Sequence, residues 1–201
     1  TTNPYCAVLP GTENNPPTVL DFATSIVAGG KVRVAKNKGE QMPEGYLLDN
    51  QGRPTTDPNA LYTTPKGAIR PMGEHKGYGL SVINELFGGV LTRGGTCRPA
   101  NNHENDTILN GMLSIVIDPM RLIDRAFFNS ETDATLAHVK ASPPANPAEP
   151  VLVPGDPERM TRAERQANGV PVDDETWAEM IRAAVGVGLS AGDVEALAFR
   201  N

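Results

Sequence analysis

Apolar and β-branched residues gather in two short segments near the start of the chain. Residues 5–9 read YCAVL, and residues 18–22 read TVLDF, with an acid next to the last position. The sequence between them, PGTENNPP, is rich in the proline, glycine and asparagine that form turns. This pattern predicts two strands, over residues 5–9 and 18–22, joined by a turn-rich loop.

A helical pattern follows the second strand. The apolar positions recur at three- and four-residue steps, at Ile26, Val27, Gly30, Val34 and Ala35. This spacing predicts a helix from Ala23 onward, with the hydroxyl of Thr24 or Ser25 as its N-cap. Asp21 would then stand at the end of a strand, beside hydroxyl groups, where α/β proteins often bind small ligands. The alternative is that Asp21 only caps the helix.

A second helical pattern covers residues 80–91 and predicts a helix with one buried face. Its apolar positions are Leu80, Ile83, Leu86, Phe87, Val90 and Leu91. His75 and Lys76 precede it, with Gly77 and Gly79 at its mouth. A helix start offers unpaired N–H groups and a positive dipole end, so these residues are suited to holding a phosphate. The alternative is an ordinary helix start after a flexible glycine loop.

The later part of the chain contains one further clear strand pattern, GMLSIVID at residues 111–118. Residues 120–139 are expected to be helical, and the four prolines of residues 141–150 indicate an extended linker. We expect two helices beyond it, the second capped by Asp173 or Asp174. Two long connections, rich in proline, glycine and asparagine, are expected to be loops: residues 39–69 and 92–106.

Composition restricts the class of protein. The 201 residues are 39% hydrophobic and 21% charged, with a formal net charge of −6, which describes a soluble globular chain. The acidic balance without a lysine or arginine cluster argues against nucleic acid as a partner. No apolar run is long enough to span a bilayer. Two cysteines form no disulfide framework, so a cytoplasmic location is expected.

Other candidate sites are weaker. Residues 186–191 (GVGLSA) have the spacing of a dinucleotide fingerprint, but they follow a helix rather than a strand. His75, His103 and His138 lack the spacing of metal ligands, so no metal is expected.

Several longer motifs occur in order: TTNP, VLDFATS, MPEGYLLDNQGRPTTDP, PMGEHKGYGL, NGMLSIVID, PGDPE and NGVPVDDETW. Over residues 2–185 the chain thereby resembles the type 2 malate/L-lactate dehydrogenase family, also called sulfolactate dehydrogenase-like. The resemblance implies an α/β fold with a non-Rossmann cofactor-binding domain and a C-terminal helical segment. It also implies an NAD(P)-dependent oxidoreductase that acts on a small 2-oxo or 2-hydroxy acid or a cyclic imino acid. The choice between NAD and NADP stays open.

The resemblance also implies which residues contact the cofactor. The first such segment is Leu20, Asp21, Phe22, Ala23, Thr24, Ser25 and Ile26. The second is His75 with Lys76, and the third is Gly155, Asp156 and Pro157. Lys76 would hold phosphate, and Asp21 with its hydroxyl neighbours would bond ribose or amide groups.

The resemblance leaves the catalytic residues outside this sequence. In the family they lie in an N-terminal region that ends just before the TNP motif, so no catalytic residue is assigned here. We expect residues 1–140 to bind NAD(P), residues 141–150 to be a linker, and residues 151–201 to pack on the missing N-terminal region. That region, whether cut away or carried by a separate chain, and a second copy in a homodimer are the expected partners. The orphaned part should then expose apolar surface.

Two alternatives to this reading stay open. One is a cofactor-binding module without activity of its own. The other is an N-terminal-threonine hydrolase, because the sequence opens on Thr1.

Overall fold

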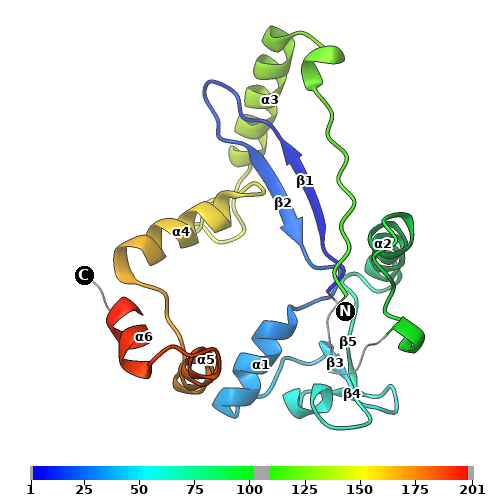
Figure 1. The fold of residues 1–201 in the computed structure, drawn as a ribbon. Helices are drawn as coiled ribbons and strands as arrows, with labels where there is room; N and C mark the ends of the chain where they lie inside the picture. The colour runs from blue at the N-terminus through cyan, green and yellow to red at the C-terminus, as the bar shows by residue number, and fades with distance from the viewer. Residues whose placement is uncertain (1, 102–108, 199–201) are drawn as a thin grey trace. The chain divides into compact units, whose positions relative to one another are not determined.

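The computed structural model describes residues 2–101 and 109–198, and it divides the chain into two compact units (Figure 1). The first contains residues 1–25 and 71–168, and the second contains residues 26–70 and 169–201. Residues 141–150, which were expected to be a linker between two domains, lie inside the first unit. Thr1 and His103 lie outside the described residues.

A β-hairpin forms the centre of the first unit. Strands β1 (Tyr5–Leu9) and β2 (Thr18–Phe22) pair antiparallel, with Tyr5 opposite Phe22, which confirms both predicted strands. The loop between them is fastened by Asp133 on α3 (Arg125–Lys140). The Asp133 carboxylate accepts hydrogen bonds from the side chains of three loop residues, Thr12, Asn14 and Asn15. These bonds, that of Thr12 first, lower the pKa of Asp133 below its ordinary value.

Thr24 forms the main polar contact inside the first unit. Its side chain is 1% exposed, and its hydroxyl donates to the carbonyl oxygens of Thr2 at 3.2 Å and Asn3 at 3.0 Å. The Thr24 amide also donates to Thr2, while the Thr24 carbonyl accepts from the Met72 amide at 2.9 Å. The predicted N-cap role of Thr24 is therefore wrong, because its hydroxyl binds the start of the chain.

The residues before β1 are held from the other side by α2 (His75–Glu85). The Asn3 side-chain amide donates to the carbonyl and hydroxyl of Ser81, each at 3.1 Å. Asn84 donates in return to the carbonyls of Asn3 and Pro4. Thr24 and α2 together clamp residues 2–4 between them.

Helix α2 runs directly into a π-helical turn, η2 (Leu86–Leu91). The predicted helix is present, but its apolar face is not buried within the part of the chain that the structure describes. Its exposed apolar residues are Tyr78, Val82, Ile83, Leu86, Phe87, Val90 and Leu91. Helical periodicity identifies an apolar face correctly, but it does not identify what covers that face.

Residues 111–118 do not form a strand, so the clearest strand predicted from the sequence is wrong. They lie extended but pair with no strand among the described residues, and Figure 1 draws them as a coil leading to α3. Residues 151–153 are also outside any strand. The helix expected over residues 120–139 is confirmed as α3, whose N-cap Asp124 accepts from the Phe127 amide at 2.9 Å.

The second unit is built around α1 (Gly29–Lys38) and a small core of Val27, Val32, Ala35, Met42 and Leu47. The helix begins at Gly29 instead of the expected Ala23. Residues 39–69 were expected to be a loop, yet they contain an antiparallel sheet of order β4-β3-β5 and a 3-10 helix. Their bounds are β3 (Leu47–Leu48), β4 (Pro54–Thr55), η1 (Pro58–Leu61) and β5 (Ala68–Ile69).

The remaining helices are divided between the two units. Helix α4 (Asp156–Asn168) belongs to the first, whereas α5 (Asp174–Gly186) and α6 (Ala191–Ala198) belong to the second. The Asp173 cap is confirmed, since its carboxylate accepts from the Thr176 amide at 2.9 Å. Helix α6 was not predicted.

The described sheets are antiparallel, and no parallel Rossmann sheet occurs among the described residues, as the non-Rossmann prediction required. None of the helices that the structure describes has the length and apolar character needed to cross a bilayer.

The Thr24 clamp generates a stability prediction. Thr24→Val removes the hydroxyl at nearly constant volume, and it should lower the free energy of unfolding by about 1 kcal/mol because the one hydrogen bond that the hydroxyl donates, shared between two carbonyl oxygens, is lost. Urea unfolding followed by circular dichroism measures the change. Thr24→Ser keeps the hydroxyl and serves as the control. An unfolding free energy of Thr24→Val at or above that of the wild type would show that the clamp does not stabilise the unit.

Candidate functional site

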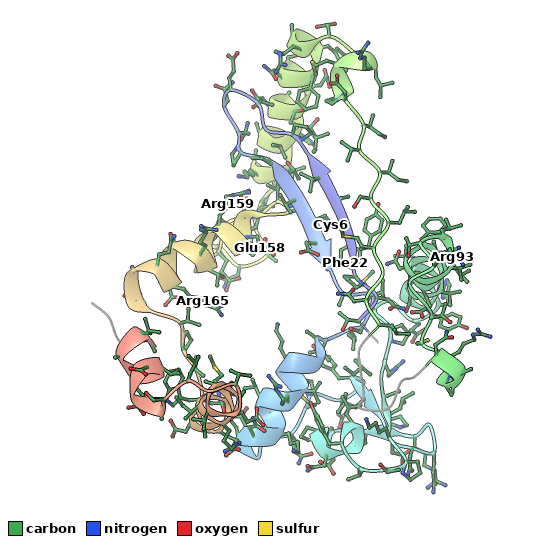
Figure 2. All side chains as sticks on the ribbon, in the orientation of Figure 1. Cys6, Phe22, Arg93, Glu158, Arg159 and Arg165 are labelled. Atoms are coloured by element: carbon green, nitrogen blue, oxygen red, sulfur yellow. The ribbon has the colours of Figure 1, made fainter. Side chains whose placement is uncertain are left out.

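The first predicted contact segment lies on β2 and just beyond it. Alternation along a strand places Leu20 and Phe22 on one face of the hairpin and Asp21 on the other. Cys6 lies opposite Asp21, and the ring of Tyr5 contacts Phe22 at 5.7 Å between centroids. Figure 2 labels Cys6 and Phe22 on the two strands. A single ligand therefore cannot contact Leu20, Asp21 and Phe22 through their side chains from one side.

The remaining residues of that segment also lie in different surroundings. Thr24 is buried and already bonded within the chain. Ser25 forms an antiparallel backbone bridge with Pro71, which brings the end of the segment next to the start of the PMGEHKGYGL motif. Ile26 belongs to the second unit, where its amide donates to Arg70 at 2.9 Å.

The Ser25–Pro71 bridge lies next to the end of the first segment, and α2 begins a few residues after Pro71. His75 and Lys76 occupy this turn and are exposed. Neither their side chains nor that of Asp21 has a hydrogen-bond or ion-pair partner among the described residues. Free charges of opposite sign at neighbouring segments are suited to a polar ligand that carries both an anion and hydroxyl or amide groups.

The helix start itself is less open than expected. The amides of Lys76 and Gly77 donate to the carbonyls of Gly73 and Met72, so they are not free for a phosphate. Gly77 is buried, and the backbone of Met72 lies so close that a Cβ on residue 77 would stand 2.1 Å from the Met72 carbonyl oxygen. This glycine is required for packing and not for ligand approach. Gly79 is different, since a Cβ there would meet no atom within 4 Å.

The backbone before α2 is sharply turned. Glu74 is the N-cap with φ 53° and ψ −115°, which is a sparsely populated conformation for a residue with a side chain. Such a conformation costs roughly 1–3 kcal/mol and is found preferentially at functional sites.

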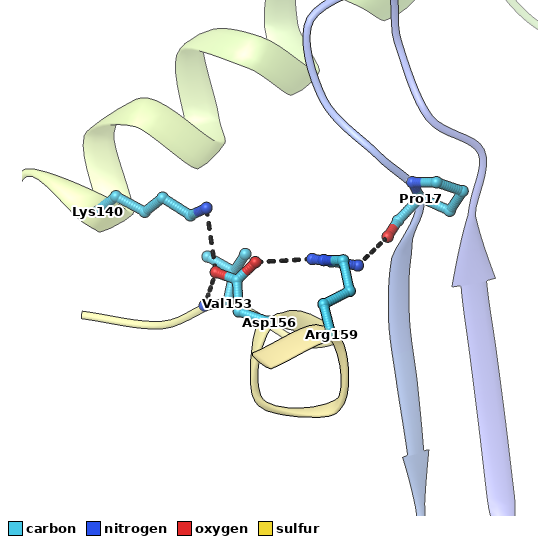
Figure 3. A network of polar contacts seen from close by, with 5 residues as sticks. All are labelled: Pro17, Lys140, Val153, Asp156 and Arg159. Carbon is cyan, nitrogen blue, oxygen red and sulfur yellow. Dashed lines mark hydrogen bonds and ion pairs between the residues drawn. The ribbon is translucent and has the colours of Figure 1, made fainter. Parts of the chain in front are cut away.

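The third predicted segment is built around Asp156 at the start of α4 (Figure 3). One carboxylate oxygen of Asp156 accepts from Arg159 at 2.7 Å, and the other accepts from the Val153 amide at 3.1 Å and pairs with Lys140 at 3.0 Å. Arg159 also donates to the Pro17 carbonyl just before β2. The Arg159 bond, followed by the Val153 amide, lowers the pKa of Asp156 to about 2.

Asp156 is thus satisfied by the chain, in contrast to Asp21. Gly155 adopts φ 96°, and a Cβ there would lie 2.7 Å from the Arg159 guanidinium, so the glycine admits this arginine. Pro157 lines a shallow groove of about 350 Å³ along α4, together with Glu158, Thr161, Arg162 and Arg165. Figure 2 labels Glu158 and Arg165 on this helix.

The second and third predicted segments are attached to opposite ends of β2, which carries the first. The Val19 amide donates to Pro154 at 3.3 Å at one end, and Thr24 binds Met72 at the other. Five residues at about 3.3 Å each separate these contacts by up to about 16 Å. The arrangement suits an elongated ligand better than a compact one. Sequence reasoning missed the residues that create it, namely Asn3, Asn84 and Arg159.

No group of three or more His, Cys, Asp or Glu side chains within the described ranges is arranged to hold a metal ion.

Comparison with known proteins shows the family of this chain. Residues 1–181 match the sequence pattern of the malate/L-lactate dehydrogenase family. The chain belongs to this family. It is 40% identical to hydroxycarboxylate dehydrogenase B of Escherichia coli K12 over 97% of its own length and 54% of that protein. It is 37% identical to L-sulfolactate dehydrogenase of Methanothermobacter thermautotrophicus, over 86% of this chain and 48% of that protein.

The fold is similar as well. A solved E. coli structure assigned to the malate/lactate dehydrogenases superposes with a TM-score of 0.87 at 40% identity, over 98% of this chain and 54% of that one. These matches confirm the resemblance and the sulfolactate dehydrogenase-like α/β fold. The chain spans about half the length of the curated relatives that it matches.

The Asp156 network generates a pH prediction. Because the folded pKa lies near 2, below the ordinary value, the stability that this carboxylate contributes is present above that ordinary value and is lost as pH falls toward 2. Asp156→Asn should be less stable than wild type at neutral pH, and the difference should shrink below about pH 4. Urea midpoints measured between about pH 7 and pH 3 test this, with Glu158→Gln as a control on the same helix. A pH-independent difference would contradict the assignment.

Proposed function

We propose that the complete protein transfers a hydride between a nicotinamide dinucleotide and a small 2-hydroxy or 2-oxo acid or a cyclic imino acid. This chain supplies the cofactor-binding part. The observation that carries the proposal is that the side chains of Asp21 and Lys76 are exposed and have no partner among the described residues, on bridged segments of a chain of this dehydrogenase family. The nicotinamide would supply the redox chemistry, and these residues would bind and orient the dinucleotide.

Lys76 would pair with a phosphate of the dinucleotide, and His75 beside it would donate a further hydrogen bond. Asp21 would accept hydrogen bonds from ribose hydroxyls or an amide. The spacing of up to about 16 Å along β2 accommodates an elongated ligand that extends toward Pro157 and the α4 groove. Asp156 would hold the start of α4 in position and would not contact the dinucleotide through its carboxylate, because its oxygens are already bonded to Arg159, Val153 and Lys140.

The substrate class follows from the relatives. They include a hydroxycarboxylate dehydrogenase, a sulfolactate dehydrogenase, a 2,3-diketo-L-gulonate reductase and pyrroline-2-carboxylate reductases. The substrates in these names share a small acid with an oxygen or nitrogen function at a reducible carbon. The resemblance to the family assigns no catalytic residue to this chain, so the catalytic group and the substrate clamp would come from the other part of the family's chain.

Removal of the Lys76 charge tests the cofactor site. Lys76→Ala should weaken NADH or NADPH binding by about 1.5–3 kcal/mol, or roughly 10- to 150-fold in Kd, because a charge-assisted hydrogen bond to phosphate is lost. Fluorescence titration of the reduced cofactor measures the effect. Lys66→Ala removes an exposed lysine elsewhere and should leave Kd unchanged. Equal affinities for wild type and Lys76→Ala would place Lys76 outside the site.

Activity assays distinguish the dehydrogenase from a mere binding module. The 201-residue chain should bind nucleotide and reduce neither pyruvate, oxaloacetate nor Δ1-piperideine-2-carboxylate with either cofactor. A longer chain that includes the other half of the family's sequence should oxidise NADH or NADPH with at least one of them. Turnover by the 201-residue chain would show that it contains the catalytic groups. Absence of turnover in a folded, cofactor-binding longer chain would favour the module.

A further inference from the structure

Residues 111–118 form an extended apolar segment that the described residues leave bare. Ile115, Val116 and Ile117 are 77%, 93% and 66% exposed. Consecutive residues of an extended chain point to opposite faces, so both faces of this segment are apolar and uncovered. A continuous run of β-branched residues is typical of a strand buried on both faces.

The segment is nevertheless fixed at both ends. Gly111 packs so closely on η2 that a Cβ there would lie 1.8 Å from the Gly88 carbonyl oxygen. At the other end, the Asp118 carboxylate accepts from the Met120 amide at 3.0 Å. The segment thus packs on η2 at its start and leads into a capped turn at its end, and its backbone groups between these points pair with no strand that the structure describes.

A second open edge lies in the same unit. Strand β1 pairs with β2 along one edge, and its other edge has no strand partner within the described part of the chain. All five residues of β1 are exposed. Open, apolar edges promote aggregation, and folded proteins cover or pair them.

The solved E. coli structure indicates what covers these edges. Its matched half follows the same path as this chain with a TM-score of 0.87 over 98% of the present residues. That half is only 54% of the solved chain. A similar path therefore occurs in a protein with nearly twice as much polypeptide, and the unmatched part is the chain available to cover the segment.

We propose that residues 111–118 are a strand of a sheet completed by the part of the family's polypeptide that this chain does not match. A partner segment adds a β-strand beside it by main-chain hydrogen bonds, and apolar side chains from the same part of the polypeptide pack above and below the sheet, over Ile115 and Ile117 on one face and Val116 on the other. The inference rests on the bare segment and on the length of the relatives, and it is independent of the cofactor.

Hydrogen exchange tests the pairing directly. We would join the unmatched half of the E. coli hydroxycarboxylate dehydrogenase B to this chain and follow deuterium uptake in peptides covering residues 111–118. In the joined protein these amides should exchange roughly 100-fold more slowly than in the 201-residue chain, because strand pairing protects them. Val116→Asp should abolish the protection in the joined protein. Lys66→Asp, at an exposed position outside both residues 111–118 and residues 151–201, should not change it.

Three results would overturn the proposal. Fast exchange at residues 111–118 in a joined protein whose β1 amides are protected would show that the segment stays bare. Protection in the 201-residue chain that disappears on dilution would identify a second copy as the occupant. If the joined protein does not fold, the aligned peptide of the intact E. coli relative is measured instead, and fast exchange there contradicts the inference.

Discussion

The first unit depends on the hydrogen bonds of one buried threonine, through both its hydroxyl and its backbone. Thr24 fixes Thr2 and Asn3 on one side and Met72 on the other, so it sets both where β1 begins and where α2 begins. A buried hydroxyl needs a partner, and a buried carbonyl left without one destabilises the fold, so the three segments specify one another. The TTNP and VLDFATS motifs thus have a structural meaning before any ligand is considered.

The same logic separates structural charges from available ones. The carboxylates of Asp133 and Asp156 are each bonded to several donors, and both pKa values are lowered accordingly. Asp21 and Lys76 are exposed and carry no partner among the described residues. A carboxylate that is already satisfied gains little from a ligand, whereas a free one can form new charge-assisted bonds. Within a motif, therefore, the structure ranks residues that the sequence treats alike.

Local signals were read correctly from the sequence, and long-range ones were not. The hairpin strands and the Asp173 cap depend on neighbours within a few residues, and both are confirmed. The start of α1 was misplaced because Thr24 bonds residues 2 and 3 instead of capping a helix. The short strands at residues 47–69 were missed because two-residue strands carry no periodicity. Lys76 and Asp21 stay predicted cofactor contacts, and their free side chains are the structural support for that role.

The failed strand prediction at residues 111–118 has the same origin as the exposed face of α2. Both segments carry the apolar pattern of a buried element, and both lack a cover in the described chain. The accessible surface is 14824 Å², whereas a compact 21.4 kDa protein exposes roughly 9,100 Å² and two separate compact units of that total mass about 11,000 Å². The relatives possess polypeptide beyond the half that this chain matches, and in our proposal that part covers the bare segment. On that proposal the apolar pattern of residues 111–118 predicts an interface between two halves of the family fold and not a core within one.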